Sequence, residues 1–174
     1  MSFSLSSFLT HPVSPDPVRP GQESVWSYPR PAVAERTDRH LKIVHRGFTL
    51  AETRSGFRTL ETSHPPSYYF PPEHVATMLL GESHQRTQCE WKGQARYFDV
   101  DIDDEVLRDA AWCYPNPDPA FAMLTGCFAF YAGVFDTCTV DGENVVPQGG
   151  GFYGGWITGD LAGPFKGVPG SRGW

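Results

Sequence analysis

Proline and glycine interrupt this chain so often that they limit which folds it can form. The 174 residues include 16 Pro and 18 Gly, and no long helical pattern runs uninterrupted between them. Proline fixes φ and removes a backbone donor, and glycine weakens a helix interior, so short strands joined by structured loops are favoured over long helices. A chain of this length can bury one core. We therefore predict a mainly β fold of compact antiparallel sheets with one or two short helices.

Composition divides the chain into three parts. Residues 1–24 are rich in Ser and Pro and form an extended arm. Residues 25–148 carry the strand patterns and form a β-rich core domain. Residues 149–174 contain ten glycines interleaved with aromatic residues. A segment of this kind cannot hold itself together, so we expect its aromatic side chains to anchor it on the core.

Alternation of apolar residues and turn signals locates the strands. In segment 40–46, Leu41, Ile43 and His45 share one face, and Asp141-Gly142 is a strong hairpin turn. The other segments that we predict as strands are 49–53, 58–62, 88–91, 96–102, 106–114, 127–131, 135–140 and 145–146.

One short helix is expected after Pro71-Pro72. Val75, Met78 and Leu79 fall on one face at helical spacing, so we expect them to pack in the core.

Charge and cysteine usage exclude several classes of partner. The net charge of −6, with scattered Lys and Arg, provides no attraction for nucleic acid or anionic lipid. No apolar run is long enough to span a membrane, and the first residues lack the features of a secretory signal. The four cysteines do not have zinc-ligand spacing, which favours reduced thiols and a cytoplasmic location. A small molecule is the expected partner, and the cofactor remains unknown.

Segment 60–69, LETSHPPSYY, concentrates groups that could perform chemistry. Glu61 or His64 could be a general base, because burial or a charged neighbour can tune the pKa of either group toward neutrality. Ser63 and Tyr69 could bind the ligand. The alternative is structural: His64 caps the end of a strand and the prolines stiffen a turn.

Two further segments could complete a binding site. In CEWKG, Glu90 and Lys92 flank a Trp, Gly93 permits close backbone approach, and Lys92 could hold an anionic or carbonyl group. Glu90 and Lys92 could instead form a weak surface pair on a strand. In AWCYPNP, Trp112 and Tyr114 share a strand face and could form two walls of an aromatic cage, although core packing is the commoner fate of such a pair.

A metal-dependent alternative involves Asp99, Asp101 and Asp103, which fall on one strand face as a nucleotidyl-transfer site would require. No Gly-Ser phosphate loop precedes them, and Asp104 stands where a calcium loop needs glycine. A solvated strand face is therefore favoured, and we predict no metal site. The sequence GGGFYG matches a dinucleotide-binding pattern only formally, because no βαβ unit surrounds it.

Four ordered motifs resemble one known family. They read LETSHPPSYYFPPEHV, CEWKGQARYFDV, AAWCYPNPDPAFA and NVVPQGGGFYGGWIT, between a WSYPRP lead and a GPFKG-x-PG-x-x-GW tail. Residues 25–174 are thereby similar to the longer members of the domain of unknown function 427 family. The resemblance implies a β-tent-like domain, related to folds that hold small ligands in aromatic cages and are often homodimers. It implies no established activity, although a nucleotidyltransferase label is sometimes attached to the family.

The leading hypothesis is a small-molecule-binding β domain that could also act on a flat or ring-shaped ligand. Its walls would be Tyr69, Trp112 and Tyr114, and its polar floor would be Glu61, His64 and Lys92, with Ser63 and Glu90 as further ligand contacts. The alternatives are metal-dependent nucleotidyl transfer and a non-catalytic interaction protein that uses residues 149–174. The leading hypothesis requires the three motif segments to meet around one cavity.

Overall fold

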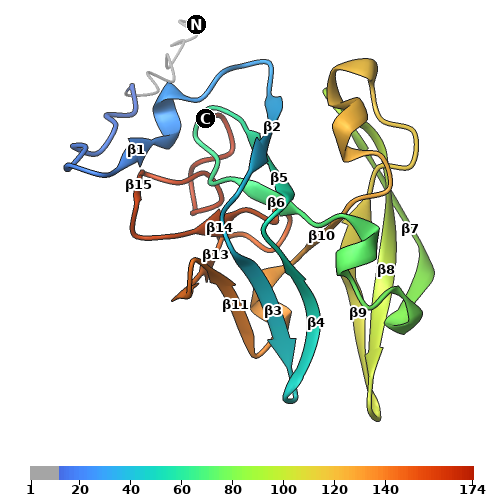
Figure 1. Ribbon diagram of the computed structural model, residues 1–174. Coiled ribbons are helices and arrows are strands. Elements are labelled where there is room, and N and C mark those ends of the chain that lie inside the picture. The colour runs from blue at the N-terminus through green and yellow to red at the C-terminus, as the bar shows by residue number, and fades with distance from the viewer. Residues whose placement is uncertain (1–11) are drawn as a thin grey trace, which may run out of the picture.

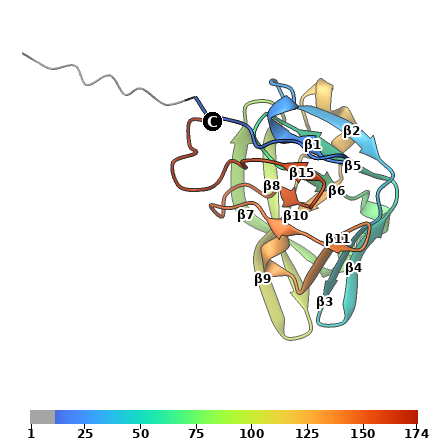
Figure 2. The same ribbon diagram turned by 90° about the vertical axis from the view of Figure 1, so that its left-hand side faces the viewer.

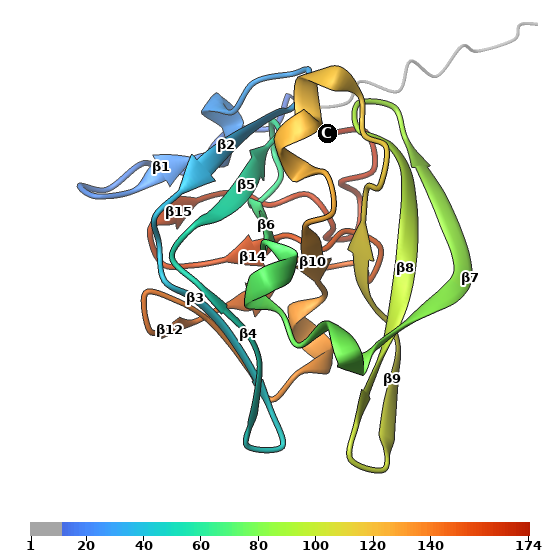
Figure 3. The ribbon, with the colours of Figure 1, turned by 45° about the vertical axis from the view of Figure 1, so that its right-hand side comes forward.

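Two β layers from different parts of the chain face each other in the computed structural model, which describes residues 12–174 (Figure 1, Figure 3). One layer is the antiparallel sheet β10-β9-β8-β7. Its strands are β7 (Leu80–Cys89), β8 (Gly93–Ile102), β9 (Glu105–Cys113) and β10 (Phe128–Phe130). The predicted mainly β fold with several antiparallel sheets is confirmed.

The opposite layer combines a four-stranded and a three-stranded antiparallel sheet, in the orders β12-β11-β3-β4 and β2-β5-β6. The strands of the first are β3 (Leu41–His45), β4 (Phe48–Thr53), β11 (Thr137–Val140) and β12 (Glu143–Asn144). The strands of the second are β2 (Val33–Thr37), β5 (Gly56–Leu60) and β6 (Ser67–Tyr69). The C-terminal segment adds β13 (Val146–Pro147) and β14 (Trp156–Ile157), which pair with each other (Figure 1).

Local sequence explains the hairpins that were predicted. In β3, Leu41, Ile43 and His45 are buried and the residues between them are half-buried, as the alternation indicates. The predicted turn Asp141-Gly142 has φ values of 50° and 81° and joins β11 to β12. Two successive left-handed residues match the twist of adjacent antiparallel strands, which is why Asp-Gly suits this position.

The predicted helix after Pro71-Pro72 is wrong. Two 3-10 turns, η2 (Pro72–His74) and η3 (Thr77–Leu79), flank an extended Val75 that bridges to Ala51 of β4. Val75 is buried, but Met78 is 82% exposed and does not pack in the core. Pairing with β4 therefore replaces the helical hydrogen bonds that the spacing suggested.

Other element boundaries differ from the expectation. Strand β2 pairs with β5. It was not predicted, because its sequence contains charged residues and shows no alternation of apolar residues. The expected strand 88–91 is the end of the longer β7, and residues 90–92 form the turn into β8. The remaining short helical segments are also 3-10 turns, η1 (Val25–Ser27), η4 (Pro119–Leu124) and η5 (Ala132–Val134).

Trp156 lies at the centre of the core and is completely buried. Its indole N–H donates to the carbonyl of Phe130 at 3.0 Å, and its backbone N–H donates to the carbonyl of Pro66 at 2.8 Å. Its ring centroid is 5.5 Å from that of Tyr68 and 6.1 Å from that of Phe70. One residue of the C-terminal segment thus joins both layers.

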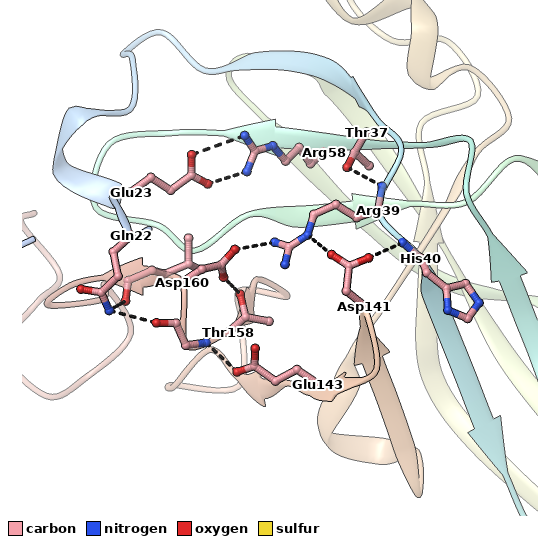
Figure 4. A network of polar contacts seen from close by, with 12 residues as sticks. Gln22, Glu23, Thr37, Arg39, His40, Arg58, Asp141, Glu143, Thr158 and Asp160 are labelled. Carbon is pink, nitrogen blue, oxygen red and sulfur yellow. Dashed lines mark hydrogen bonds and ion pairs between the residues drawn. The ribbon is translucent and has the colours of Figure 1, made fainter. Parts of the chain in front are cut away.

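Strand pairing and an ion-paired arginine hold the terminal segments of the described chain in place. The short strand β1 (Glu23–Ser24) pairs in parallel with β15 (Leu161–Ala162) (Figure 2). Arg39 bridges Asp141 at 2.7 Å and Asp160 at 2.8 Å, so it ties the β11–β12 turn to the C-terminal segment (Figure 4). Of the arm predicted for residues 1–24, residues 1–11 lie outside the described residues.

No helix between residues 12 and 174 is both long enough and apolar enough to cross a membrane.

A substitution at Gly155 tests how closely the C-terminal segment must approach the core. A Cβ atom there would lie 2.5 Å from the carbonyl oxygen of Pro65 and 2.6 Å from Oε1 of Gln148, so we expect Gly155→Ala to lower the free energy of unfolding by about 2 kcal/mol. Gly81→Ala in β7 is the matched control, because nothing lies within 4 Å of its added Cβ. Urea unfolding measures both, and equal stabilities of the two variants would contradict the close approach.

Candidate functional site

One cavity of about 370 Å³ lies where the three predicted segments meet. We call it the His64 cavity. Its lining comes from the β5–β6 connection, the β7–β8 turn, the end of β9 and the C-terminal segment, and comprises Thr59, Glu61, His64, Pro65, Ser67, Tyr69, Thr87, Gln88, Cys89, Glu90, Trp91, Lys92, Tyr97, Trp112, Tyr114, Tyr131, Gln148, Phe152, Tyr153, Gly154 and Lys166.

Seven of the eight predicted site residues line the His64 cavity, and Ser63 does not. Ser63 is completely buried with φ of 72°, and its Oγ has no hydrogen-bond partner among the described residues. Its backbone N–H donates to Val25, and its carbonyl accepts from the N–H of Lys166. Ser63 therefore shapes the turn behind the cavity and does not contact its interior.

The neighbours of His64 fix which ring nitrogen carries the proton. Oε1 of Gln148 accepts from the backbone N–H of Gly155 at 3.0 Å, so its amide nitrogen is free to donate to Nδ1 of His64 at 3.1 Å and to the carbonyl of Lys166 at 2.8 Å. A neutral imidazole that accepts at Nδ1 carries its proton on Nε2. That nitrogen is 3.9 Å from Oε1 of Glu61.

Burial keeps His64 neutral. It lowers the pKa of the imidazole to about 4, and the positive charges of Lys166, Arg30 and Lys92 act in the same direction, while Glu61 opposes them. The ring of Tyr153 packs edge-on against it, with centroids 4.7 Å apart. At neutral pH His64 is therefore a hydrogen-bond donor through Nε2, and Glu61 is the better placed proton acceptor of the two.

Lys92 presents a buried positive charge to the cavity. The side chain is only 9% exposed, and its Nζ lies 5.8 Å from the ring centroid of Tyr114 and 5.7 Å from that of Phe121. Within residues 12–174 it makes no ion pair with a carboxylate. Burial alone would lower the pKa of Lys92, but the interactions with Tyr69, Cys89 and Glu61 outweigh burial, and the net shift raises this pKa.

The β7–β8 turn explains how a lysine becomes buried here. Gly93 has φ of 103°, a conformation that L side chains rarely adopt, and this lets the chain fold back after Lys92. The carbonyl of Lys92 accepts from the N–H of Asp118 at 3.0 Å, so the loop after Tyr114 covers the turn. The alternative of a surface pair between Glu90 and Lys92 is therefore wrong.

Aromatic side chains form the walls. The ring of Tyr69 is 6.3 Å from that of Trp112 and 6.5 Å from that of Tyr114, so the three predicted wall residues also pack on one another. The backbone of Gly154 lies directly on the indole of Trp112, where a Cβ would come within 2.1 Å of a ring carbon. The C-terminal segment closes the cavity on this side.

The sequence analysis missed several cavity residues, chiefly Cys89, Gln148, Tyr153 and Lys166. Gln148 and Tyr153 belong to a quoted motif, but nothing local shows that they reach His64. Cys89 is the half-buried thiol at the cavity. The other cysteines are buried, and burial raises the pKa values of Cys113 and Cys127 to about 11 and of Cys138 to about 12.

The three aspartates of the nucleotidyl-transfer alternative do not form a metal site. Asp99 accepts from Arg108 at 2.6 Å and from the backbone N–H of Asp109 at 2.8 Å, and Asp103 lies in the β8–β9 turn with φ of 55°. In the part of the chain that the structure describes, no group of three His, Cys, Asp or Glu side chains could hold a metal ion.

The protonation of His64 can be checked by NMR. We expect its ring resonances to stay those of the Nε2–H tautomer from pH 8 down to about pH 5 and to titrate near pH 4.

The depressed pKa of His64 also means that the free energy of unfolding falls as the pH falls from about 6.5 to 4, by on the order of 3 kcal/mol. His64→Gln should lack this loss in urea unfolding, whereas His84→Gln, at an exposed side chain, should retain it. Titration of His64 above pH 6 would contradict the assignment.

Comparison with known proteins supports the family resemblance and adds no activity. No curated protein matches the chain. A family model matches residues 33–141, which hold three of the four motif segments but not Gln148 or Tyr153. Its short label alludes to nucleotidyl transfer, while its description assigns no function. The chain belongs to the family described as Domain of unknown function (DUF427).

Proposed function

We propose that this protein binds a small planar organic anion in the His64 cavity, with the negative group of the ligand against Lys92. The observation that carries the proposal is the buried ammonium of Lys92, which lies between aromatic rings and forms no ion pair with a carboxylate of residues 12–174. Removing a charge from water costs several kcal/mol unless a partner compensates it. A carboxylate or similar group on a ligand would supply that partner.

The walls of the cavity favour a flat ligand. Tyr69, Trp112 and Tyr114 present ring surfaces, and Trp91 lies at the turn beside Glu61, with its indole nitrogen 3.4 Å from the carboxylate. Aromatic rings stabilise a planar guest by offset or edge contacts of about 1 kcal/mol each beyond area burial. The combination of flat walls and one cation favours a ring that bears an acidic substituent.

Glu61 and His64 would provide proton chemistry if the ligand is also transformed. The Nε2–H of His64 can donate to the ligand, and the carboxylate of Glu61 can accept a proton from it, because both groups line the same cavity. This division of roles follows from the tautomer that Gln148 imposes on His64. Catalysis, the homodimer, the absence of nucleic-acid and membrane partners, and the cytoplasmic location remain predictions.

Benzoate and benzamide test the proposal because they share a shape and differ in charge. We expect benzoate to bind at least tenfold more tightly, since a hydrogen bond to a charged group contributes about 1.5–3 kcal/mol. Binding is measured by NMR titration and by protection of Cys89, the half-buried cavity thiol, from alkylation by iodoacetamide.

Lys92→Met should weaken benzoate binding at least tenfold, because the flexible thioether can fill the same aromatic space without the charge. The matched control is Lys42→Met in β3, a half-buried lysine whose Nζ is 3.6 Å from Glu52 and which lies outside the cavity. Thermal unfolding verifies that each variant is folded. Equal binding of benzoate and benzamide, or unchanged affinity in Lys92→Met, would rule out recognition of an anion by Lys92.

A further inference from the structure

A second hollow adjoins the His64 cavity. Its volume is about 430 Å³, and it lies between the sheet of β7, β8 and β9 and the segment from η5 to Gly155. We call it the Val134 hollow. Its apolar side is formed by Tyr131, Ala132, Val134, Pro147 and Phe152.

The two hollows share walls. Seven residues line both, and they are Thr87, Tyr97, Tyr131, Gln148, Phe152, Tyr153 and Gly154. A residue that contributes to two hollows stands between them or runs along both. The His64 cavity and the Val134 hollow are therefore neighbouring compartments of one cleft beneath the C-terminal segment.

We take Phe152 and Tyr153, which line both compartments, as the partition between them. Their ring centroids are 5.0 Å apart, and the hydroxyl of Tyr131 donates to the carbonyl of Phe152 at 3.0 Å. Phe152 is 61% exposed, so moving its ring from its present position would remove few packing contacts. Gly150 and Gly151 precede it with φ of 88° and 72°, which places the partition on a glycine loop and not on a strand.

The compartments differ in chemistry. The His64 cavity contains the ammonium of Lys92 together with Glu61 and His64. In the Val134 hollow, both charged side chains already have partners, because Arg108 pairs with Asp99 at 2.6 Å and Asp109 accepts from the hydroxyl of Ser83. Val134 is 39% exposed although it is apolar. A molecule that spanned the cleft would place a charged end in the first compartment and bury apolar atoms in the second.

We infer that the ligand is an elongated amphipathic anion whose planar acidic head occupies the His64 cavity and whose apolar tail occupies the Val134 hollow. This inference rests on the proposed function, because it takes the recognition of the head by Lys92 as given. The tail would displace water from Val134, Pro147 and the ring of Tyr131, and the ring of Phe152 would cover it.

Benzoates that carry a straight alkyl chain opposite the carboxylate test the inference, from unsubstituted benzoate to para-hexylbenzoate. Once the chain passes the partition, affinity should rise roughly three- to fourfold for each methylene that is buried. Calorimetric titration measures each affinity, and the increase per methylene is the quantity that matters.

Two substitutions at one position separate the compartments. Val134→Trp fills the hollow and Val134→Glu places a charge in it, so both should abolish the gain with chain length while leaving the affinity for benzoate within about twofold of that of the wild type. Because Val134 is partly exposed, both variants should fold, and thermal unfolding verifies this. Val106→Trp, at an exposed position in β9 outside both hollows, is the control that should retain the gain.

The outcomes distinguish the two ideas. If benzoate binds through Lys92 but longer chains bring no gain, or if the gain survives in both Val134 variants, the two-compartment ligand is ruled out and the proposed function stands. If no benzoate of any length depends on Lys92, the proposed function fails and this inference fails with it.

Discussion

The hydrogen bonds and ring contacts of Trp156 hold the two β layers in their mutual arrangement. The residue belongs to the C-terminal segment, yet its indole N–H donates to β10 and its backbone N–H donates to the connection before β6. A buried polar group must find a partner, and here both donors find theirs on different layers. The segment that follows the family-matched region is consequently part of the core. The residues just before Trp156, such as Tyr153 and Gly154, are thereby held against the His64 cavity.

That placement explains the electrostatics of the site. Gly154 and Gly155 allow the backbone to lie on Trp112 and Pro65, and this brings Gln148 within hydrogen-bond distance of His64. The same packing withdraws water from His64, which therefore stays neutral. Glu61 acts on Lys92 across the cavity but forms no ion pair with it, so the donors of the ammonium stay available, and this is the physical basis for expecting an anionic ligand.

Much of the fold could be predicted from the sequence because strand and turn signals are local. The alternation in β3 and the Asp141-Gly142 turn depend only on side-chain period and on residues that tolerate positive φ. Strand β2 was missed because an edge strand with charged residues has no apolar period. The helix expected near Val75 does not form, although the apolar residues have helical spacing. The backbone at Val75 is extended instead, because it pairs with Ala51 of β4.

The sequence by itself determined which chemical groups the site contains, since Glu61, His64, Lys92 and the aromatic residues stand in short, dense motifs. Only the tertiary structure decided what those groups can do. Whether Lys92 is buried without an ion pair and which nitrogen of His64 is protonated depend on residues far away in the chain, such as Gln148. Desolvation and hydrogen-bond geometry are properties of a packed environment, so no local pattern encodes them.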